Sequence, residues 1–438
     1  MASFVGRQEE LRRLDRVLES ERKICYVEAE PRMGATTFVR RFCDKSKCIH
    51  TTFREGTERE CLRSFRNAME DFTGEPIESE DLDFAYLFQI LTGIAREYDP
   101  VIVFDGTHNA PDSFVSQVRW FSEQREHMVI LIGHNDRERF GMTFSDVIEL
   151  EPLSFEESRL MHPKMSPMDA LRTYMVVGGS PAYHSLMNKS DFESSVEKAF
   201  LGNYPKLCTE CELILRRSSV PYPMCCAILS DMANSMGRPV DIAQTEGISR
   251  QLCDIYLKKL TEEDLICRLN PVGNAPRKPV YIIKNPLVAF YLMVIRGNPV
   301  LEFGDRPGYE DIEHYVDMFM ELRFRDICEE YLLRHHDCVN IGRWWIKEEN
   351  TFKPTMLAIV KEDEQEVCLV ADCKFRGGKI DNGALKAFSA RAELISEVPD
   401  KRLVMFSISG FEDKLQKKAR NEGVILVGPA ELLQLSGQ

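Results

Sequence analysis

Short, continuous apolar runs alternate with longer amphipathic segments over the first 150 residues. The runs at 24–27, 101–104 and 128–132 suit parallel strands that are buried on both faces. The segments 61–72 and 82–98 show the three- to four-residue apolar spacing of helices. Strands that alternate with helices predict an α/β domain built on a doubly wound parallel sheet.

The pattern changes after residue 219. Helices are expected at 224–236, from 240 onward and at 249–262, followed by strands at 265–268 and 280–283, which together predict a winged helix. A stretch at 298–308 with Pro299, Gly304 and Pro307 predicts a linker. Beyond the linker we expect a helix at 319–333 and strands at 356–360, 367–371, 403–408 and 423–427.

The chain is therefore expected to contain five segments. They are an α/β domain at 1–152, a helical lid at 153–218, a winged helix at 219–286, a linker at 287–312 and a small α/β domain at 313–438.

The first strand runs into a partial phosphate-binding loop. The full pattern is G-x-x-x-x-G-K-[ST], and here Gly34 and Thr36 fit, whereas Ala29 and Ala35 replace the first glycine and the lysine. Glycines let backbone amides approach a phosphate, the lysine neutralises the β- and γ-phosphates, and the hydroxyl binds magnesium. The segment is either a nucleotide loop that has lost its charge or a strand-turn-helix without a ligand.

Asp105 ends the buried run at 101–104, where ligands bind in open α/β sheets. In phosphate-loop enzymes such an aspartate assists magnesium, and a following glutamate often prepares the attacking water. Gly106 stands in the glutamate's place. The candidate nucleotide-binding residues are Gly34, Thr36, Thr37 and Asp105, and Thr36 and Asp105 would hold a weakly bound magnesium ion.

These motifs resemble the archaeal-type ATP-binding family, a branch of the AAA+/STAND phosphate-loop NTPases. The matching parts are the opening segment at 4–11, the loop at 29–37, Asp105 and the G-G-x-P-x-Y segment at 178–183. The last domain also matches at 341–345, 372–375 and 406–411. The resemblance implies a nucleotide domain, a helical lid, a winged helix and a C-terminal PD-(D/E)xK nuclease-like fold.

The nuclease motif that this resemblance implies is incomplete. Asp372 and Lys374 supply its second half, on one face of a strand. Alignment places Thr355 where the first aspartate is expected, and Arg325 where the family often has glutamate. Two metal-binding carboxylates are thus missing. We expect no cleavage, and we expect Asp372 to pair with Arg325 or Lys374 in place of a metal ion.

The composition of the chain bears on whether it could bind DNA or a membrane. The net charge of −14 argues against broad DNA coating, although a local basic face would remain compatible with DNA binding. The predicted recognition helix mixes Arg250 and Lys258 with acids, which slightly favours packing against neighbouring domains over DNA binding. No run reaches the roughly 20 apolar residues of a membrane span, and we expect a cytoplasmic protein.

Fourteen cysteines are scattered through apolar segments, and we expect them to be reduced. Cys208, Cys211, Cys225 and Cys226 suggest a zinc site, but neither a histidine pair nor a second C-x-x-C completes one, so buried thiols are the simpler interpretation.

The sequence favours a degenerate ATP-binding protein that acts as a regulatory or scaffold pseudo-ATPase. ATP and magnesium would bind weakly or not at all, and the protein partner is unidentified. The alternative is a working ATPase that couples hydrolysis to DNA binding through residues 219–286.

Overall fold

The computed structural model describes residues 4–44, 46–78, 82–124, 126–235, 237–270, 272, 279–303, 307–344, 355–362, 365–395, 398 and 400–433. Gly304 of the expected linker, Trp345 of the C-terminal motif and Asp363 of the expected hairpin tip lie outside these residues. The chain divides into two compact units, Met1–Met161 with Gly179–Ser185, and His162–Gly178 with Leu186–Gln438.

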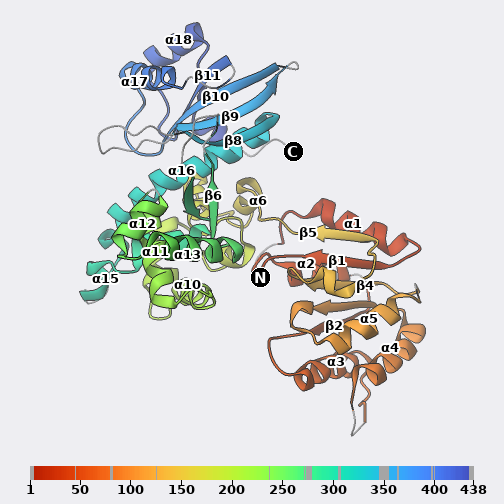
Figure 1. The fold of residues 1–438 in the computed structure, drawn as a ribbon. Coiled ribbons are helices and arrows are strands. Elements are labelled where there is room, and N and C mark those ends of the chain that lie inside the picture. Colours follow the sequence, from red (N-terminus) through yellow and green to blue (C-terminus); the bar gives the residue numbers. More distant parts are fainter. Residues whose placement is uncertain are drawn as a thin grey trace. The chain divides into compact units, whose positions relative to one another are not determined.

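The first unit is built on a parallel five-stranded sheet with strand order β2-β3-β4-β1-β5 (Figure 1). Its strands are β1 (Ile24–Glu28), β2 (Cys48–Thr52), β3 (Val101–Asp105), β4 (Val129–Gly133) and β5 (Asp146–Glu149). The longer helices are α1 (Gln8–Glu19), α2 (Ala35–Cys43), α3 (Glu58–Thr73), α4 (Phe84–Tyr98) and α5 (Asp112–Ser122). The predicted parallel α/β sheet is confirmed.

Both faces of this sheet are covered. Alternate residues of each strand enter different cores: Ile24 and Tyr26 pack with α3, α4 and α5, whereas Cys25 and Val27 pack with α1 and α2. This two-sided burial explains why the central strands are continuous apolar runs. The short elements of this unit are η1 (Thr107–Asn109), η2 (Arg137–Phe140), α6 (Phe155–Arg159) and α8 (Pro181–His184).

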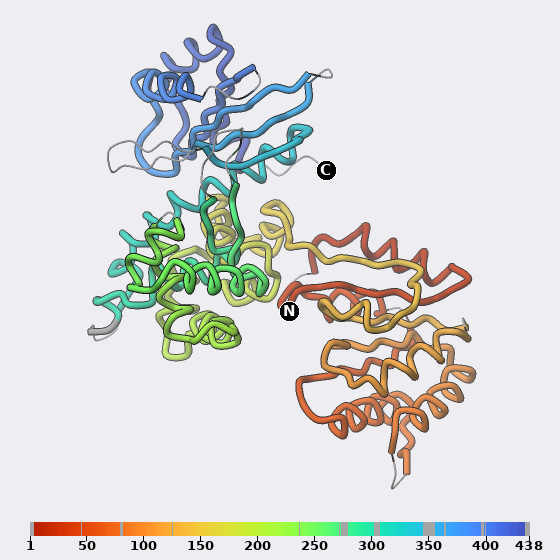
Figure 2. Tube along the Cα trace, viewed as in Figure 1, coloured from red at the N-terminus to blue at the C-terminus, as the bar shows by residue number. Residues whose placement is uncertain are grey.

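The second unit begins with helices, whose path Figure 2 follows. They are α7 (Pro167–Val177), α9 (Phe192–Val196), η3 (Glu197–Leu201), α10 (Lys206–Arg216), α11 (Tyr222–Asn234), α12 (Pro239–Thr245) and α13 (Arg250–Glu262). An antiparallel hairpin of β6 (Ile266–Leu269) and β7 (Val280–Ile283) follows. These are the elements that a winged helix requires, although the winged-helix assignment itself stays a prediction.

The segment expected as a linker contains buried structure. Helices α14 (Pro286–Phe290) and η4 (Tyr291–Ile295) place Leu287, Phe290 and Val294 in the core. Only the part around α15 (Pro299–Phe303) and η5 (Tyr309–Asp311) has the proline- and glycine-rich character that suggested a linker. Residues 287–295 thus pack inward through apolar side chains, and the division that places a linker at 287–312 stays a prediction.

The C-terminal part is a mixed sheet between helices (Figure 1). Its strands, in the order β12-β11-β10-β9-β8, are β8 (Cys338–Trp344), β9 (Thr355–Glu362), β10 (Gln365–Lys374), β11 (Asp400–Ser407) and β12 (Ile425–Val427). Helices α17 (Asn382–Glu393) and α18 (Asp413–Glu422) pack on one face. The long helix α16 (Glu313–His335) packs through Phe324 and Tyr331 against Phe375 and Phe406, and α19 (Pro429–Leu433) ends the described chain.

Candidate functional site

The phosphate-loop segment retains the backbone geometry of an anion site. Gly34 has φ of 82° and precedes α2, a left-handed conformation that glycine adopts without strain. The first hydrogen bond of α2 runs from the Phe38 amide to the Gly34 carbonyl at 2.9 Å. The amides of Ala35, Thr36 and Thr37 therefore have no acceptor within the helix, the arrangement that binds phosphate groups at helix N-termini.

The G-G-x-P-x-Y segment supports this loop from within the same unit. The carbonyl oxygen of Arg32 accepts hydrogen bonds from the Ser180 hydroxyl at 3.1 Å and from the Ala182 amide at 3.4 Å. A Cβ atom at Gly34 would lie 3.6 Å from the Pro181 ring. The sequence identified this motif but gave no sign that it contacts the loop.

Thr36 and Asp105, the two predicted magnesium ligands, lie together. The Thr36 hydroxyl donates to Asp105 Oδ2 at 2.6 Å, and His50 Nε2 lies 3.4 Å from the same oxygen. Asp105 is 9% exposed. His50 was missed by the sequence analysis, because its position depends on the pairing of β2 with β3, where Thr52 lies opposite Asp105.

Gly106 is sterically constrained. Its φ is 79°, and a Cβ atom there would lie 2.3 Å from the carbonyl oxygen of Phe53. Its amide also donates to the Ile132 carbonyl at 2.9 Å. A glutamate therefore does not fit at this position without a backbone shift. The sequence alone did not show this steric constraint, because it depends on a backbone oxygen of a distant residue.

The end of β4 carries a second polar network. Asp136, 4% exposed, accepts hydrogen bonds from the Tyr26 hydroxyl and, at 2.8 Å, from the Thr107 hydroxyl. Burial and then the Asp136 contact raise the pKa of Tyr26, so the phenol stays protonated. A Cβ atom at Gly133 would lie within 2.4 Å of all three side chains, so this position requires glycine.

Glu28, at the end of β1, is also engaged. Its carboxylate accepts the Asn135 amide at 2.8 Å and lies 3.6 Å from His134 Nδ1. Asn135 has φ of 54°, a conformation that asparagine tolerates better than most residues. Glu28 thus fixes the turn after β4, a role that its place near the phosphate loop did not suggest.

In the C-terminal sheet, the alignment of Thr355 with the missing acid agrees with the strand register. Ala371 pairs with Met356, so the next step of the ladder places Asp372 opposite Thr355. Thr355 is 1% exposed, and its hydroxyl has no hydrogen-bond partner among the residues that the structure describes. A neutral side chain thus occupies the position beside Asp372.

Asp372 is held by Arg391, whose Nη2 lies 2.5 Å from Asp372 Oδ1. The expectation that Arg325 or Lys374 would pair with Asp372 is wrong. Arg391 belongs to α17, nineteen positions further along the chain, and its approach depends on how α17 packs on the sheet. Arg325 instead lines a cavity beside α16.

The predicted recognition helix α13 carries paired charges. Arg250 Nε lies 3.0 Å from Asp254, and Lys258 Nζ lies 3.7 Å from Glu262. Both pairs are one helical turn apart and exposed. The basic side chains of α13 therefore already have acidic partners on their own helix.

The four cysteines that suggested a zinc site lie on two helices. Cys208 and Cys211 lie on α10, Cys225 and Cys226 on α11, and burial raises the pKa of Cys208 to about 12. Within the described ranges, no group of three or more His, Cys, Asp or Glu side chains is arranged to hold a metal ion. Across the same residues, no helix has the length and apolar character needed to span a membrane.

The first unit combines a parallel five-stranded sheet with a glycine-containing loop that leads into α2. Residues 290–386 match the domain family DUF234, described as "Archaea bacterial proteins of unknown function". The chain thus resembles an archaeal-type family of phosphate-loop ATPases, as its motifs predicted. No match to a curated protein was found.

Solved structures with similar folds include three archaeal proteins. A Walker-type ATPase of Pyrococcus abyssi is 15% identical with a TM-score of 0.48, and the match covers 66% of this chain and 96% of that one. The ORC2 protein of Aeropyrum pernix, in ADPNP–ADP complexes, is 11% identical with a TM-score of 0.41, covering 72% and 94%.

The third is a STAND protein of Pyrococcus horikoshii with a tetratricopeptide repeat sensor. It is 16% identical with a TM-score of 0.33, and the match covers 75% of this chain and 46% of that one. All three TM-scores lie below 0.5.

Proposed function

We propose that this protein is a pseudo-ATPase, a regulatory or scaffold protein with an ATPase fold that binds nucleotide weakly or not at all and does not hydrolyse it. The observation that carries the proposal is the contact at Gly106. The position of the expected catalytic acid holds a left-handed glycine whose Cβ would lie 2.3 Å from a backbone oxygen. The side chain that is expected to prepare the attacking water is therefore missing from this position.

The phosphate side of the site supports the same proposal. Ala35 provides no charge for the β- and γ-phosphates, and Pro31 has no amide hydrogen to offer. A lost charge-assisted phosphate contact weakens binding by about ten- to a hundredfold. The free amides of Ala35, Thr36 and Thr37 remain, so the loop fits an anion but provides little charge for a triphosphate.

The magnesium side of the site fits better. The Thr36 hydroxyl and the Asp105 carboxylate, 2.6 Å apart, are oxygen donors of the kind that magnesium prefers. A nucleotide-bound ion would supply charge neutralisation between the phosphates. In the chain itself, Thr36 and His50 hold Asp105 in place.

The C-terminal domain supports a structural role. We propose that it is an inactive nuclease-like domain, because Asp372 is paired with Arg391 and the residue opposite it is the uncharged Thr355. Two carboxylates would be needed to hold the metal ion that activates water.

The alternative is a working ATPase that is coupled to DNA binding, and the preserved Thr36–Asp105 pair is the observation that favours it. Calorimetry with ATP and magnesium, followed by a phosphate-release assay on the same sample, separates the two. Weak binding or none, without phosphate release, is expected. Tight binding with turnover would contradict the proposal and establish the ATPase.

A further inference from the structure

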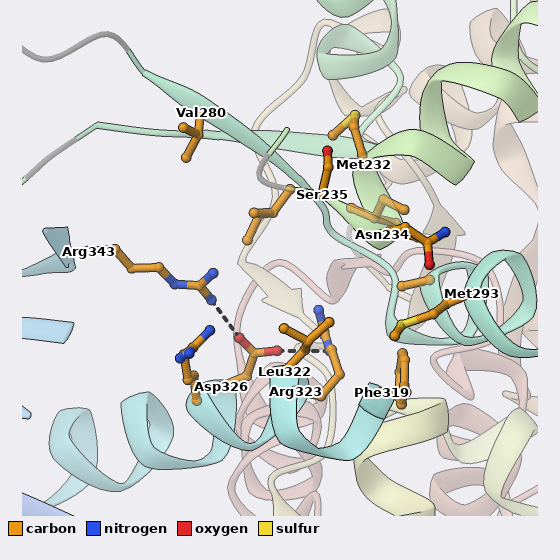
Figure 3. A pocket seen from close by; sticks show the side chains of 15 residues that line it. Met232, Asn234, Ser235, Val280, Met293, Phe319, Leu322, Arg323, Asp326 and Arg343 are labelled. Atoms are coloured by element: carbon orange, nitrogen blue, oxygen red, sulfur yellow. Dashed lines mark hydrogen bonds and ion pairs between the residues drawn. The ribbon is translucent and has the colours of Figure 1, made fainter. Parts of the chain in front are cut away.

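A cavity of about 320 Å³ lies inside the second unit, between the end of α11, strand β7 and helix α16 (Figure 3). Buried apolar side chains from four elements line one part of it: Met232, Val280, Met293 and Phe319. Charged side chains line another part: Arg323, Arg325, Asp326 and Arg343. An apolar wall with a few converging polar groups is the usual make-up of a small-molecule site.

The Asp326 carboxylate forms ion pairs with two of the guanidinium groups, those of Arg323 and Arg343, as Figure 3 shows. Arg343 Nη2 lies 3.1 Å from Asp326 Oδ1, and Arg323 Nε lies 2.9 Å from Asp326 Oδ2. The Arg343 and Arg323 side chains are 17% and 18% exposed. Asp326 is therefore shared between two largely buried cations.

Arg325 makes no ion pair or hydrogen bond with any other residue that the structure describes. Burial, and to a smaller degree the neighbouring charge of Arg343, lower the pKa of Arg325. The carboxylates of Glu321 and Asp372 act on it only at longer range. A guanidinium that is partly removed from water without a close anion, as Arg325 is, is unfavourable.

The charges around the cavity do not balance. Three guanidinium groups and one carboxylate line it, which leaves a formal charge of +2. Glu329, another acid on α16, lies outside the cavity lining, and burial and then the Asp326 charge raise its pKa. An anion in the cavity would remove the imbalance.

We propose that this cavity binds a phosphate monoester with an apolar or aromatic body. A dianionic phosphate matches the charge of +2, whereas a carboxylate would leave one positive charge uncompensated. The planar forks of Arg325 and Arg343 suit phosphate oxygens. The body of the ligand packs against Phe319 and the sulfur atoms of Met232 and Met293, which suit an aromatic ring.

Calorimetry of the full chain with 1-naphthyl phosphate, in the absence of ATP, tests this proposal. Saturable binding is expected, and Arg325→Met should weaken it by about tenfold or more, since one charge-assisted contact is lost. Arg268→Met is the matched control, because Arg268 is exposed on β6 and lies outside the cavity lining, and it should change nothing. Arg325→Met should not lower the melting temperature, because it removes a charge without a close partner.

Two further probes test the ligand class. Neutral 1-naphthol should bind far more weakly than its phosphate ester, and 1-naphthoate should lie between them. No saturable binding of 1-naphthyl phosphate would overturn the proposal, as would tighter binding of 1-naphthoate. An equal loss of affinity in Arg325→Met and Arg268→Met would also overturn it, because it would indicate unspecific charge attraction. None of these results depends on whether the phosphate loop binds nucleotide.

Discussion

The proposed phosphate-loop site and the proposed nuclease-like site each contain one aspartate at the end of a buried strand, but with different partners. Asp105 is held by the neutral hydroxyl of Thr36 at 2.6 Å and by His50 at 3.4 Å. Asp372 is held at 2.5 Å by the guanidinium group of Arg391. The first carboxylate keeps its charge available for a cation, whereas the second is already neutralised by the protein. Under the proposed function, the two sites therefore differ in how much of their chemistry remains.

The largest effect is expected from substitutions of Gly106, which follows Asp105 in the phosphate-loop site. Gly106→Glu should lower the free energy of unfolding by about 2–5 kcal/mol, because a left-handed backbone costs a side chain about 1–2 kcal/mol and the contact with Phe53 adds overpacking. Gly106→Ala should show most of the same loss. Chemical denaturation measures both.

Gly74 provides the matched control. Its φ is 75°, and a Cβ atom there would meet nothing within 4 Å, so Gly74→Ala carries the backbone strain without the contact. Equal losses in Gly74→Ala and Gly106→Ala would mean that Phe53 does not exclude a side chain. The position would then be free to regain its acid.

Restoring the loop's cation is the second test. Ala35→Lys should tighten ATP binding by about ten- to a hundredfold, since it returns a charge-assisted phosphate contact. Ala35→Met has similar length without the charge and should not. Calorimetry in magnesium compares the three proteins, and unchanged affinity in Ala35→Lys would show that Ala29 and Pro31 already prevent phosphate binding.

Removing the Asp372 carboxylate should lower the stability of the protein and change no DNA-cleaving activity. Asp372→Ala leaves the Arg391 guanidinium without its partner, and because the side chains are 17% and 21% exposed, a loss of about 1–3 kcal/mol is expected, between exposed and buried pairs. Adding Arg391→Met should recover part of that loss. Metal-dependent DNA cleavage by the wild-type protein that disappears in Asp372→Ala would contradict this account.

The smallest effect is expected on DNA. Because Arg250 and Lys258 already pair with Asp254 and Glu262, replacing either with alanine should change weak, salt-sensitive DNA binding only slightly. A titration followed by fluorescence anisotropy measures it. Nanomolar, sequence-selective binding at physiological salt, lost in Arg250→Ala, would make α13 a DNA-reading helix.

The sequence predicted helices, strands and local motifs better than it predicted which side chains contact one another. The apolar runs that became β1, β3 and β4 were visible because parallel strands are buried on both faces. The contact between Thr36 and Asp105 could be expected, because a motif fixes their places on adjoining elements.

Arg391 and His50 were not found, because their contacts depend on helix packing and strand order. The constraint on Gly106 depends on a backbone oxygen of Phe53, which no side-chain pattern reveals. The division into five segments stays a prediction, and so do the winged-helix and nuclease-like assignments.

Phosphate release under single-turnover conditions, with wild-type protein in excess over ATP and magnesium, tests the central claim most directly. Asp105→Asn is the control variant, because it keeps the shape of the side chain and removes its charge. The account predicts that both proteins release phosphate at the rate of the buffer alone. Release by the wild-type protein that disappears in Asp105→Asn would contradict it and show that the site is a working ATPase.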